Sequence, residues 1–174
     1  MLKQRSYILP LILLLTCSQL AFAQNAQEPK SRETLIREWV ANLESDDIHV
    51  AARAARELGY LRATESVPAL LRVLQSSRHL SLSEHLMAKD NSVSEWVLTD
   101  VRVEIVNALG LIGDKRAVPV LKKYLKEPPK NSEVYPGAVA YALFQINGKS
   151  YKYRDRDGRV RLFQPPAGMN APAN

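Results

Sequence analysis

The chain has 174 residues, 46% of them apolar, a formal charge of +6 at pH 7 and a single cysteine, Cys17. If residues 1–23 are removed as a leader, as their pattern below predicts, the chain loses Lys3, Arg5 and Cys17. The mature chain then has 22 Lys and Arg against 18 Asp and Glu, a charge of +4, and this mild excess argues against nucleic-acid binding. Without cysteine, the mature chain can form no disulfide, thiol nucleophile or cysteine-ligated zinc site.

Residues 1–23 have the pattern of a secretory signal peptide. A positive start precedes a short apolar run over residues 8–15, and Ala21-Phe22-Ala23 fits the small-x-small pattern of a cleavage site. The run is shorter than the roughly 20 residues that span a bilayer, so an uncleaved anchor is the weaker alternative. We expect an exported protein, periplasmic or secreted, with a flexible segment over residues 24–30.

Apolar residues at helical spacing predict a helical domain over residues 31–149. Trp39 lies on the apolar stripe of the first amphipathic segment. Further helices are expected over residues 48–60, 66–75, 100–112, 116–125 and 133–146.

Residues 50–74 and 101–125 repeat each other at an offset of 51, with identity at seven of 25 aligned positions. Each copy is expected to form a helix, a turn at a glycine, and a return helix with proline in its first turn. Stacked hairpins of this kind share a continuous core and usually bind other macromolecules. The identical pairs are Val50/Val101, Leu58/Leu109, Gly59/Gly110, Val67/Val118, Pro68/Pro119, Leu70/Leu121 and Leu74/Leu125.

The end of the chain has a different pattern. Over residues 150–163, apolar and basic residues alternate on both sides of Asp157-Gly158, which predicts a small β-hairpin that caps the helical array. Residues 164–174 are rich in Pro, Ala and Asn and are expected to be disordered.

The stretch from Ala108 to Leu121, ALGLIGDKRAVPVL, closely resembles the short HEAT-type repeats named after phycobilisome lyases. Residues 50–74 are similar, and residues 138–147 resemble a partial third copy. The resemblance implies an all-α fold, a short α-solenoid of HEAT-like helix hairpins, here with a C-terminal β-hairpin. A compact repeat needs roughly 30 residues, so an insertion is expected over residues 76–99, on the face that often binds partners.

Seven residues are candidates for partner binding: Arg72, Lys122, Lys123, Lys126, Trp96, His79 and His85. The resemblance places the return helices on the concave side, where their four cations would form a basic stripe suited to an acidic partner segment. A solvated face kept soluble by lysines is the alternative. The other three residues lie in the insertion, where Trp96 is either a binding anchor or packs the insertion against the array.

No catalytic motif and no metal-ligand spacing are found in the sequence. We therefore predict that the protein is not an enzyme and uses no cofactor or metal. The expected function is that of a non-catalytic protein-binding or scaffold module in the bacterial envelope or outside the cell, without nucleic acid or stable membrane insertion. Lyase-like or chaperone-type handling of a chromophore or other small molecule, and a self-associating structural role, are the alternatives.

Overall fold

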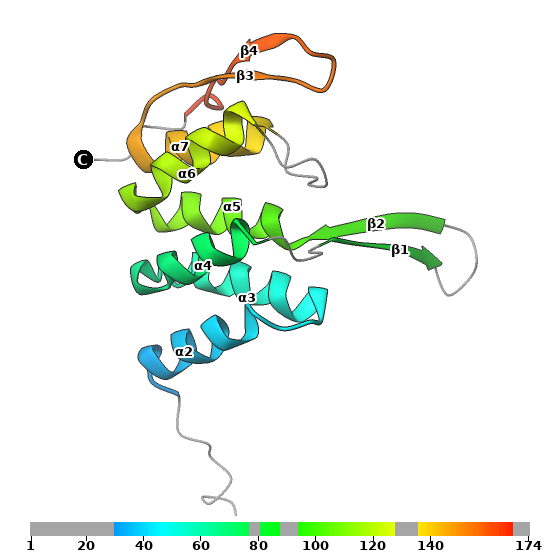
Figure 1. Ribbon diagram of the computed structural model, residues 1–174, viewed down its shortest axis with the longest axis vertical. Helices are drawn as coiled ribbons and strands as arrows, with labels where there is room; N and C mark the ends of the chain where they lie inside the picture. The colour runs from blue at the N-terminus through cyan, green and yellow to red at the C-terminus, as the bar shows by residue number, and fades with distance from the viewer. Residues whose placement is uncertain (1–29, 77–80, 88–93, 128–135, 169–174) are drawn as a thin grey trace, which may run out of the picture. The chain divides into compact units, whose positions relative to one another are not determined.

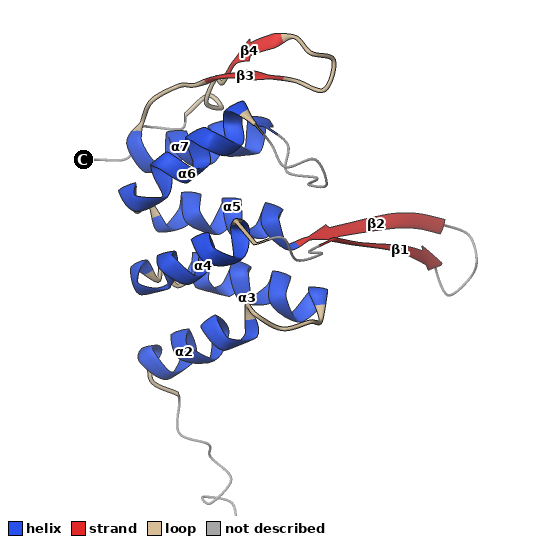
Figure 2. Ribbon diagram, viewed as in Figure 1, coloured by secondary structure: helices blue, strands red, loops and turns tan. Residues whose placement is uncertain are grey.

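The computed structural model describes residues 30–76, 81–87, 94–127 and 136–168. The chain divides into two compact units, Met1–Arg32 and Glu33–Asn174, and the elements below lie in the second, apart from the first residue of α2. Their order is α2 (Arg32–Asn42), α3 (Ile48–Tyr60), α4 (Val67–Leu74), β1 (Ser81–Met87), β2 (Ser94–Asp100), α5 (Val101–Ile112), α6 (Val118–Lys126), α7 (Pro136–Asn147), β3 (Lys152–Arg154) and β4 (Val160–Leu162) (Figure 1, Figure 2).

The predicted helix hairpins are confirmed, and local sequence explains where their helices begin and end. The Asp47 carboxylate accepts hydrogen bonds from two amides in the first turn of α3, and the Asp100 carboxylate caps α5 by accepting from the Arg102 amide. Pro68 and Pro119 lie in the first turns of α4 and α6, where a missing amide hydrogen costs little. Gly113 ends α5 with a φ of 77°, a left-handed conformation that favours glycine.

The first helices of successive hairpins stack on one another. The helix α3 packs against α5, and α5 packs against α7. Leu58 in α3 and Leu109 in α5 are both 0% exposed and occupy equivalent positions in successive layers of one core. This is the arrangement that the repeat predicts, and the mostly helical fold with a small C-terminal sheet is confirmed.

Glycine allows these layers to approach closely. A Cβ atom at Gly59 would lie 2.8 Å from the Cα of Ala108 and 3.0 Å from its Cβ. The equivalent glycine of the next layer, Gly110, faces Ala142 of α7, whose Cα would lie 3.1 Å from an added Cβ. The identical glycines of the repeat therefore serve helix packing inside the stack rather than the turns to which the sequence pattern assigns them.

The insertion forms a β-hairpin. Its strands β1 and β2 pair antiparallel over seven residues each, with Ser81 opposite Asp100 and His85 opposite Trp96. Figure 1 shows this hairpin extending away from the helices. Because β2 ends at Asp100, the residue that caps α5, the hairpin runs directly into the first helix of the second repeat.

Some predicted segments lie outside the described residues. These are residues 1–29, with the expected leader, and residues 133–135 at the start of the third expected helix, so that α7 is described from Pro136. Residues 164–168 follow β4 without regular secondary structure, and the rest of the expected disordered tail is outside. Among the helices that are described, none is long and apolar enough to cross a membrane.

Asp114 connects the two hairpins through a neighbouring arginine. Its carboxylate caps the 3₁₀ turn Lys115–Ala117 by accepting from the Arg116 amide at 2.8 Å, and it accepts from the Arg116 guanidinium at 2.6 Å. The same guanidinium donates to the carbonyl of Thr64, in the turn of the first hairpin, at 2.7 Å. The Asp114 carboxylate therefore orients the side chain that joins equivalent turns of the two repeats.

We expect Asp114→Ala to lower the free energy of unfolding by about 1 kcal/mol near neutral pH, because a cap is lost. The hydrogen bond from Arg116 lowers the pKa of the Asp114 carboxyl below its ordinary value of 3.8. Stability from such a group is fully present above its unfolded pKa and disappears as the pH falls through its folded pKa. The deficit of the variant should therefore persist down to about pH 4 and shrink below it.

Urea unfolding at neutral and acidic pH measures this deficit. Asp157→Ala, at an exposed aspartate of the C-terminal hairpin, is the matched control and should change stability by less than about 0.5 kcal/mol. A deficit of Asp114→Ala that grows on acidification would contradict the assigned role.

Candidate functional site

Three lysines share the outer face of α6. Lys122, Lys123 and Lys126 are exposed, whereas Leu121 and Tyr124 of the same helix are buried. The helical period of 3.6 residues separates the two sets onto opposite sides. None of the ion pairs found among the described side chains involves these lysines. Lys122 Nζ does lie 5.6 Å from the centre of the Tyr151 ring, a cation–π contact that leaves its charge in place. The helix α6 therefore presents positive charge to solvent, mainly through Lys123 and Lys126.

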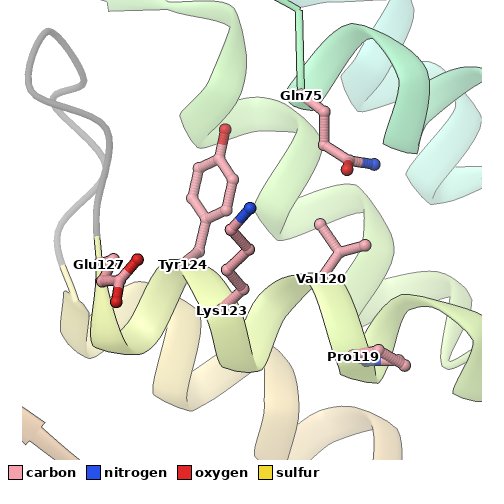
Figure 3. Close-up of a pocket in the computed structure, with 6 residues that line it drawn as sticks. All are labelled: Gln75, Pro119, Val120, Lys123, Tyr124 and Glu127. Carbon is pink, nitrogen blue, oxygen red and sulfur yellow. The ribbon is translucent and has the colours of Figure 1, made fainter.

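Two adjoining hollows border these lysines. The larger has a volume of about 390 Å³ and the smaller about 310 Å³. Figure 3 shows Val120, Lys123 and Tyr124 rising from α6 toward the side where Gln75 comes from the end of α4. The larger hollow is lined by Gln75, Pro119, Val120, Lys123, Tyr124 and Glu127. The smaller is lined by Pro119, Lys122, Lys123, Lys126 and Glu127. Together they form a partly apolar groove with a basic rim, the α6 groove.

Tyr124 joins the two return helices beside this groove. Its hydroxyl donates a hydrogen bond to the carbonyl of Leu74, the last residue of α4. The carbonyls of a final helical turn have no amide partner within the helix, so the tyrosine satisfies a group that would otherwise need water. Burial raises the pKa of the Tyr124 phenol, which keeps its proton and its capacity to donate. The side chain therefore fixes one wall of the groove.

A buried charged pair lies beside Tyr124. Asp100 is 4% exposed and Arg102 is 7% exposed, and Arg102 Nη1 lies 3.9 Å from Asp100 Oδ1. Burial is the larger influence on the pKa of Tyr124, and the positive charge of Arg102 acts against it by lowering that pKa. Charges this deep in a protein need partners, and Asp100 supplies one for Arg102, although the buried Nε of Arg102 has no hydrogen-bond partner among the described residues.

The structure divides the predicted basic stripe. Arg72 lies on α4 at the position equivalent to Lys123, but its guanidinium pairs with Glu44 at 2.5 Å. The lysines of α6 have no such pair among the described side chains. Among the described side chains, the cation of α4 is therefore paired with a carboxylate, whereas those of α6 are not, and the unpaired positive charge of the stripe is concentrated on α6.

The remaining predicted residues belong to the insertion. His79 lies outside the described residues, and His85 and Trp96 are paired positions in the backbone register of β1 and β2. The binding roles predicted for these three residues remain predictions, as do the roles of the cations.

Sequence reasoning missed Tyr124 and Arg102, although the repeat contains a signal for both. At the offset of 51, Tyr124 corresponds to Val73 and Arg102 to Ala51, and both counterparts are buried. A large polar side chain in one copy at a position where the other copy buries a small apolar one indicates a local polar cluster.

Comparisons with known proteins identify the repeat type. The family model described as PBS lyase HEAT-like repeat matches residues 50–76 and 101–127, so the chain contains two repeats of this type. Among solved structures, the complex of CpcE and CpcF of phycocyanin lyase from Nostoc sp. PCC7120 is similar, with 24% identity and a TM-score of 0.44. The similarity covers 70% of this chain and 39% of the Nostoc chain. Comparison with curated proteins gave no match.

The prediction that the protein is not an enzyme is wrong. The two repeats that the chain carries match the family model described as PBS lyase HEAT-like repeat, which points toward a lyase-related protein. The prediction depended on the absence of catalytic motifs that are recognisable by local spacing. Catalytic residues that come together only in the folded protein leave no such motif, so a search for short sequence motifs does not find them.

Proposed function

We propose that the protein is a HEAT-type binding module that holds an acidic segment of a partner protein in the α6 groove. HEAT-like repeats generally mediate protein interactions, and stacked hairpins present a rigid surface for this purpose. The single observation that carries the proposal is the grouping of Lys122, Lys123 and Lys126 along a hollow with Pro119 and Val120 in its lining. Carboxylates pair with the rim while apolar side chains enter the hollow.

Magnitudes indicate how the binding energy is divided. Exposed ion pairs contribute about 0.2–1 kcal/mol each, so the three lysines select and orient a partner more than they hold it. A side chain of leucine size that becomes fully buried contributes about 1.5–3 kcal/mol. We therefore expect specificity and salt dependence from the lysines, and most of the affinity from contacts with Pro119, Val120 and Tyr124.

Charge reversal tests this proposal. Tagged wild-type protein and the Lys122→Glu/Lys123→Glu variant are used to capture partners from extracts of the source cells, with bound proteins quantified by mass spectrometry. The matched control is Lys149→Glu/Lys152→Glu, which makes the same charge change at exposed residues near the C-terminal hairpin. We expect a specific partner to be lost with the α6 variant and retained with the control. Equal recovery with all three proteins would contradict the role of α6.

A location in the envelope or outside the cell belongs to the same proposal. It is supported by the leader pattern over residues 1–23 and by a mature sequence without cysteine. Sequencing the N-terminus of the protein recovered from cell fractions tests it. A mature chain that begins at Gln24 in the exported fraction is the expected result, and an intact N-terminus in the cytosol is the contrary one.

A second candidate function is lyase-related handling of a chromophore, which the description of the matching repeats favours. The lysine rim of the α6 groove would pair with the carboxylates of a linear tetrapyrrole. Titration with biliverdin, followed by its absorbance spectrum, tests this function. Saturable binding that is weakened by Lys122→Gln/Lys123→Gln would support it, and an unchanged spectrum would count against it.

A further inference from the structure

The C-terminal hairpin has two chemically different faces. In its register Lys152 pairs with Leu162, Arg154 with Val160, and Tyr153 with Arg161. Paired residues of antiparallel strands project to the same side, and the sides alternate along each strand. Lys152, Arg154, Val160 and Leu162 therefore share one face, named here the outer hairpin face, and Tyr153 and Arg161 share the other.

The opposite, aromatic side of the hairpin packs on α7. The ring of Phe163, just after β4, lies 5.7 Å from the ring of Tyr141 and 5.6 Å from that of Phe144. The Asn147 amide, at the end of α7, donates to the hydroxyl of Tyr151 at 2.8 Å. These contacts turn the outer hairpin face toward solvent.

Two aliphatic side chains are exposed as a result. Val160 is 62% exposed and Leu162 is 51% exposed, and both are among the few large apolar side chains of the described chain that are open to solvent. In a strand where apolar and basic residues alternate, the apolar side chains usually face the protein and the basic ones face solvent. Here Val160 and Leu162 face solvent instead, and Arg161, on the opposite face of the hairpin, pairs with Asp155 at 2.9 Å. The apolar pair is therefore displayed, with Lys152 and Arg154 as its direct cross-strand neighbours.

The hairpin also carries a positive charge that it does not neutralise. Residues 149–163 include six Lys and Arg and only two Asp, a net charge of +4. One of the two aspartates, Asp155, is used inside the hairpin: it accepts from the Arg159 amide at 2.8 Å and from the Arg161 side chain. Lys152 and Arg154 lie exposed beside Val160 and Leu162, and Arg154 also donates to the Gly158 carbonyl at 2.5 Å.

We propose that the outer hairpin face binds the surface of an anionic lipid bilayer. Cations attract anionic headgroups, and neighbouring aliphatic side chains enter the boundary between headgroups and acyl chains. A single-stranded nucleic acid would fit this face poorly, because base stacking needs accessible aromatic rings, and the outer hairpin face carries none. The inference uses a different element and different residues from the α6 groove, and the two surfaces meet only where Lys122 Nζ lies 5.6 Å from the centre of the Tyr151 ring among the described contacts.

Vesicle binding tests the proposal. Wild-type protein is mixed with vesicles of phosphatidylcholine alone and with vesicles in which about three lipids in ten are phosphatidylglycerol, and the bound fraction is measured by sedimentation. Binding is expected only to the anionic vesicles and should weaken with salt. Lys152→Gln/Arg154→Gln should lower the partition coefficient about 10- to 30-fold. Val160→Ser/Leu162→Ser should lower it while leaving the charge unchanged.

The matched control is Arg37→Gln/Lys115→Gln, which removes the same charge from exposed residues outside the hairpin and the α6 groove and should lower the partition coefficient less than about threefold. All substituted side chains are exposed, and thermal unfolding confirms that the variants fold. Absence of binding to anionic vesicles, or equal losses in the hairpin variant and the Arg37→Gln/Lys115→Gln control, would overturn the proposal. Tighter binding to an oligonucleotide than to vesicles would overturn it in favour of a nucleic acid. A dimer disrupted by Val160→Ser/Leu162→Ser would overturn it in favour of a second copy of the chain.

Discussion

Leu109→Ala is expected to lower the free energy of unfolding by about 3 kcal/mol, and Leu58→Ala by a similar amount. Both side chains are completely buried at equivalent positions of successive layers, so each truncation leaves a cavity in the same kind of environment. For a domain whose total stability is about 5–15 kcal/mol, either loss is large. Urea denaturation followed by circular dichroism measures both.

Leu162→Ala is the control for these truncations, because that leucine is 51% exposed on β4. It should change the stability by less than about 0.5 kcal/mol. A large loss for Leu109→Ala together with no loss for Leu58→Ala would show that the two repeats are not equivalent layers of one core.

Gly59→Ala is expected to destabilise the protein by about 1–3 kcal/mol, because the added methyl group would meet the backbone of Ala108 at 2.8 Å. Helix propensity alone predicts the opposite, a gain of about 1 kcal/mol, so the sign of the change decides between the two effects. The added atom meets a backbone atom, and relief therefore requires α3 and α5 to move apart.

Ala41→Gly, at an exposed position of α2, measures the propensity contribution in a helix of the same protein. It should cost about 0.5–1 kcal/mol. A Gly59→Ala variant that is more stable than the wild-type protein by a similar amount would contradict the close contact between layers. Thermal and urea unfolding of the three proteins give the comparison.

The helical part of the fold could be predicted because the signals for each helix hairpin lie within its own stretch of sequence. Apolar periodicity sets the buried face, an aspartate begins the first helix, and a proline begins the second. The insertion could not be predicted in the same way. Polar and apolar residues do not alternate along its two strand sequences, SLSEHLM and SEWVLTD, so the sequence does not mark them as strands.

The candidate site could be predicted only in part, for a related reason. The exposure of Lys122 and Lys123 follows from the helical period and needs no tertiary information. The ion pair of Arg72 with Glu44 and the hydrogen bond of Tyr124 to Leu74 join separate elements, and only the folded chain brings these groups together. Sequence reasoning therefore identified the lysine rim of the α6 groove but not its wall.

The C-terminal hairpin illustrates a further limit. Its existence follows from the Asp157-Gly158 turn between alternating runs, and the structure confirms it. Which residues face outward depends on the rings that pack on α7, and this reverses the usual expectation for Val160 and Leu162. The sequence alone predicts the element, and the tertiary contact determines its surface.

Photo-crosslinking from the α6 groove tests most directly where a partner is held. Glu127 lines both hollows and is exposed, and its replacement by a benzophenone amino acid leaves the three lysines intact. Tyr60, 67% exposed at the end of α3, is the control position of similar aromatic character. We predict a partner adduct from position 127 and none from position 60. An adduct from position 60 alone would contradict binding at the α6 groove.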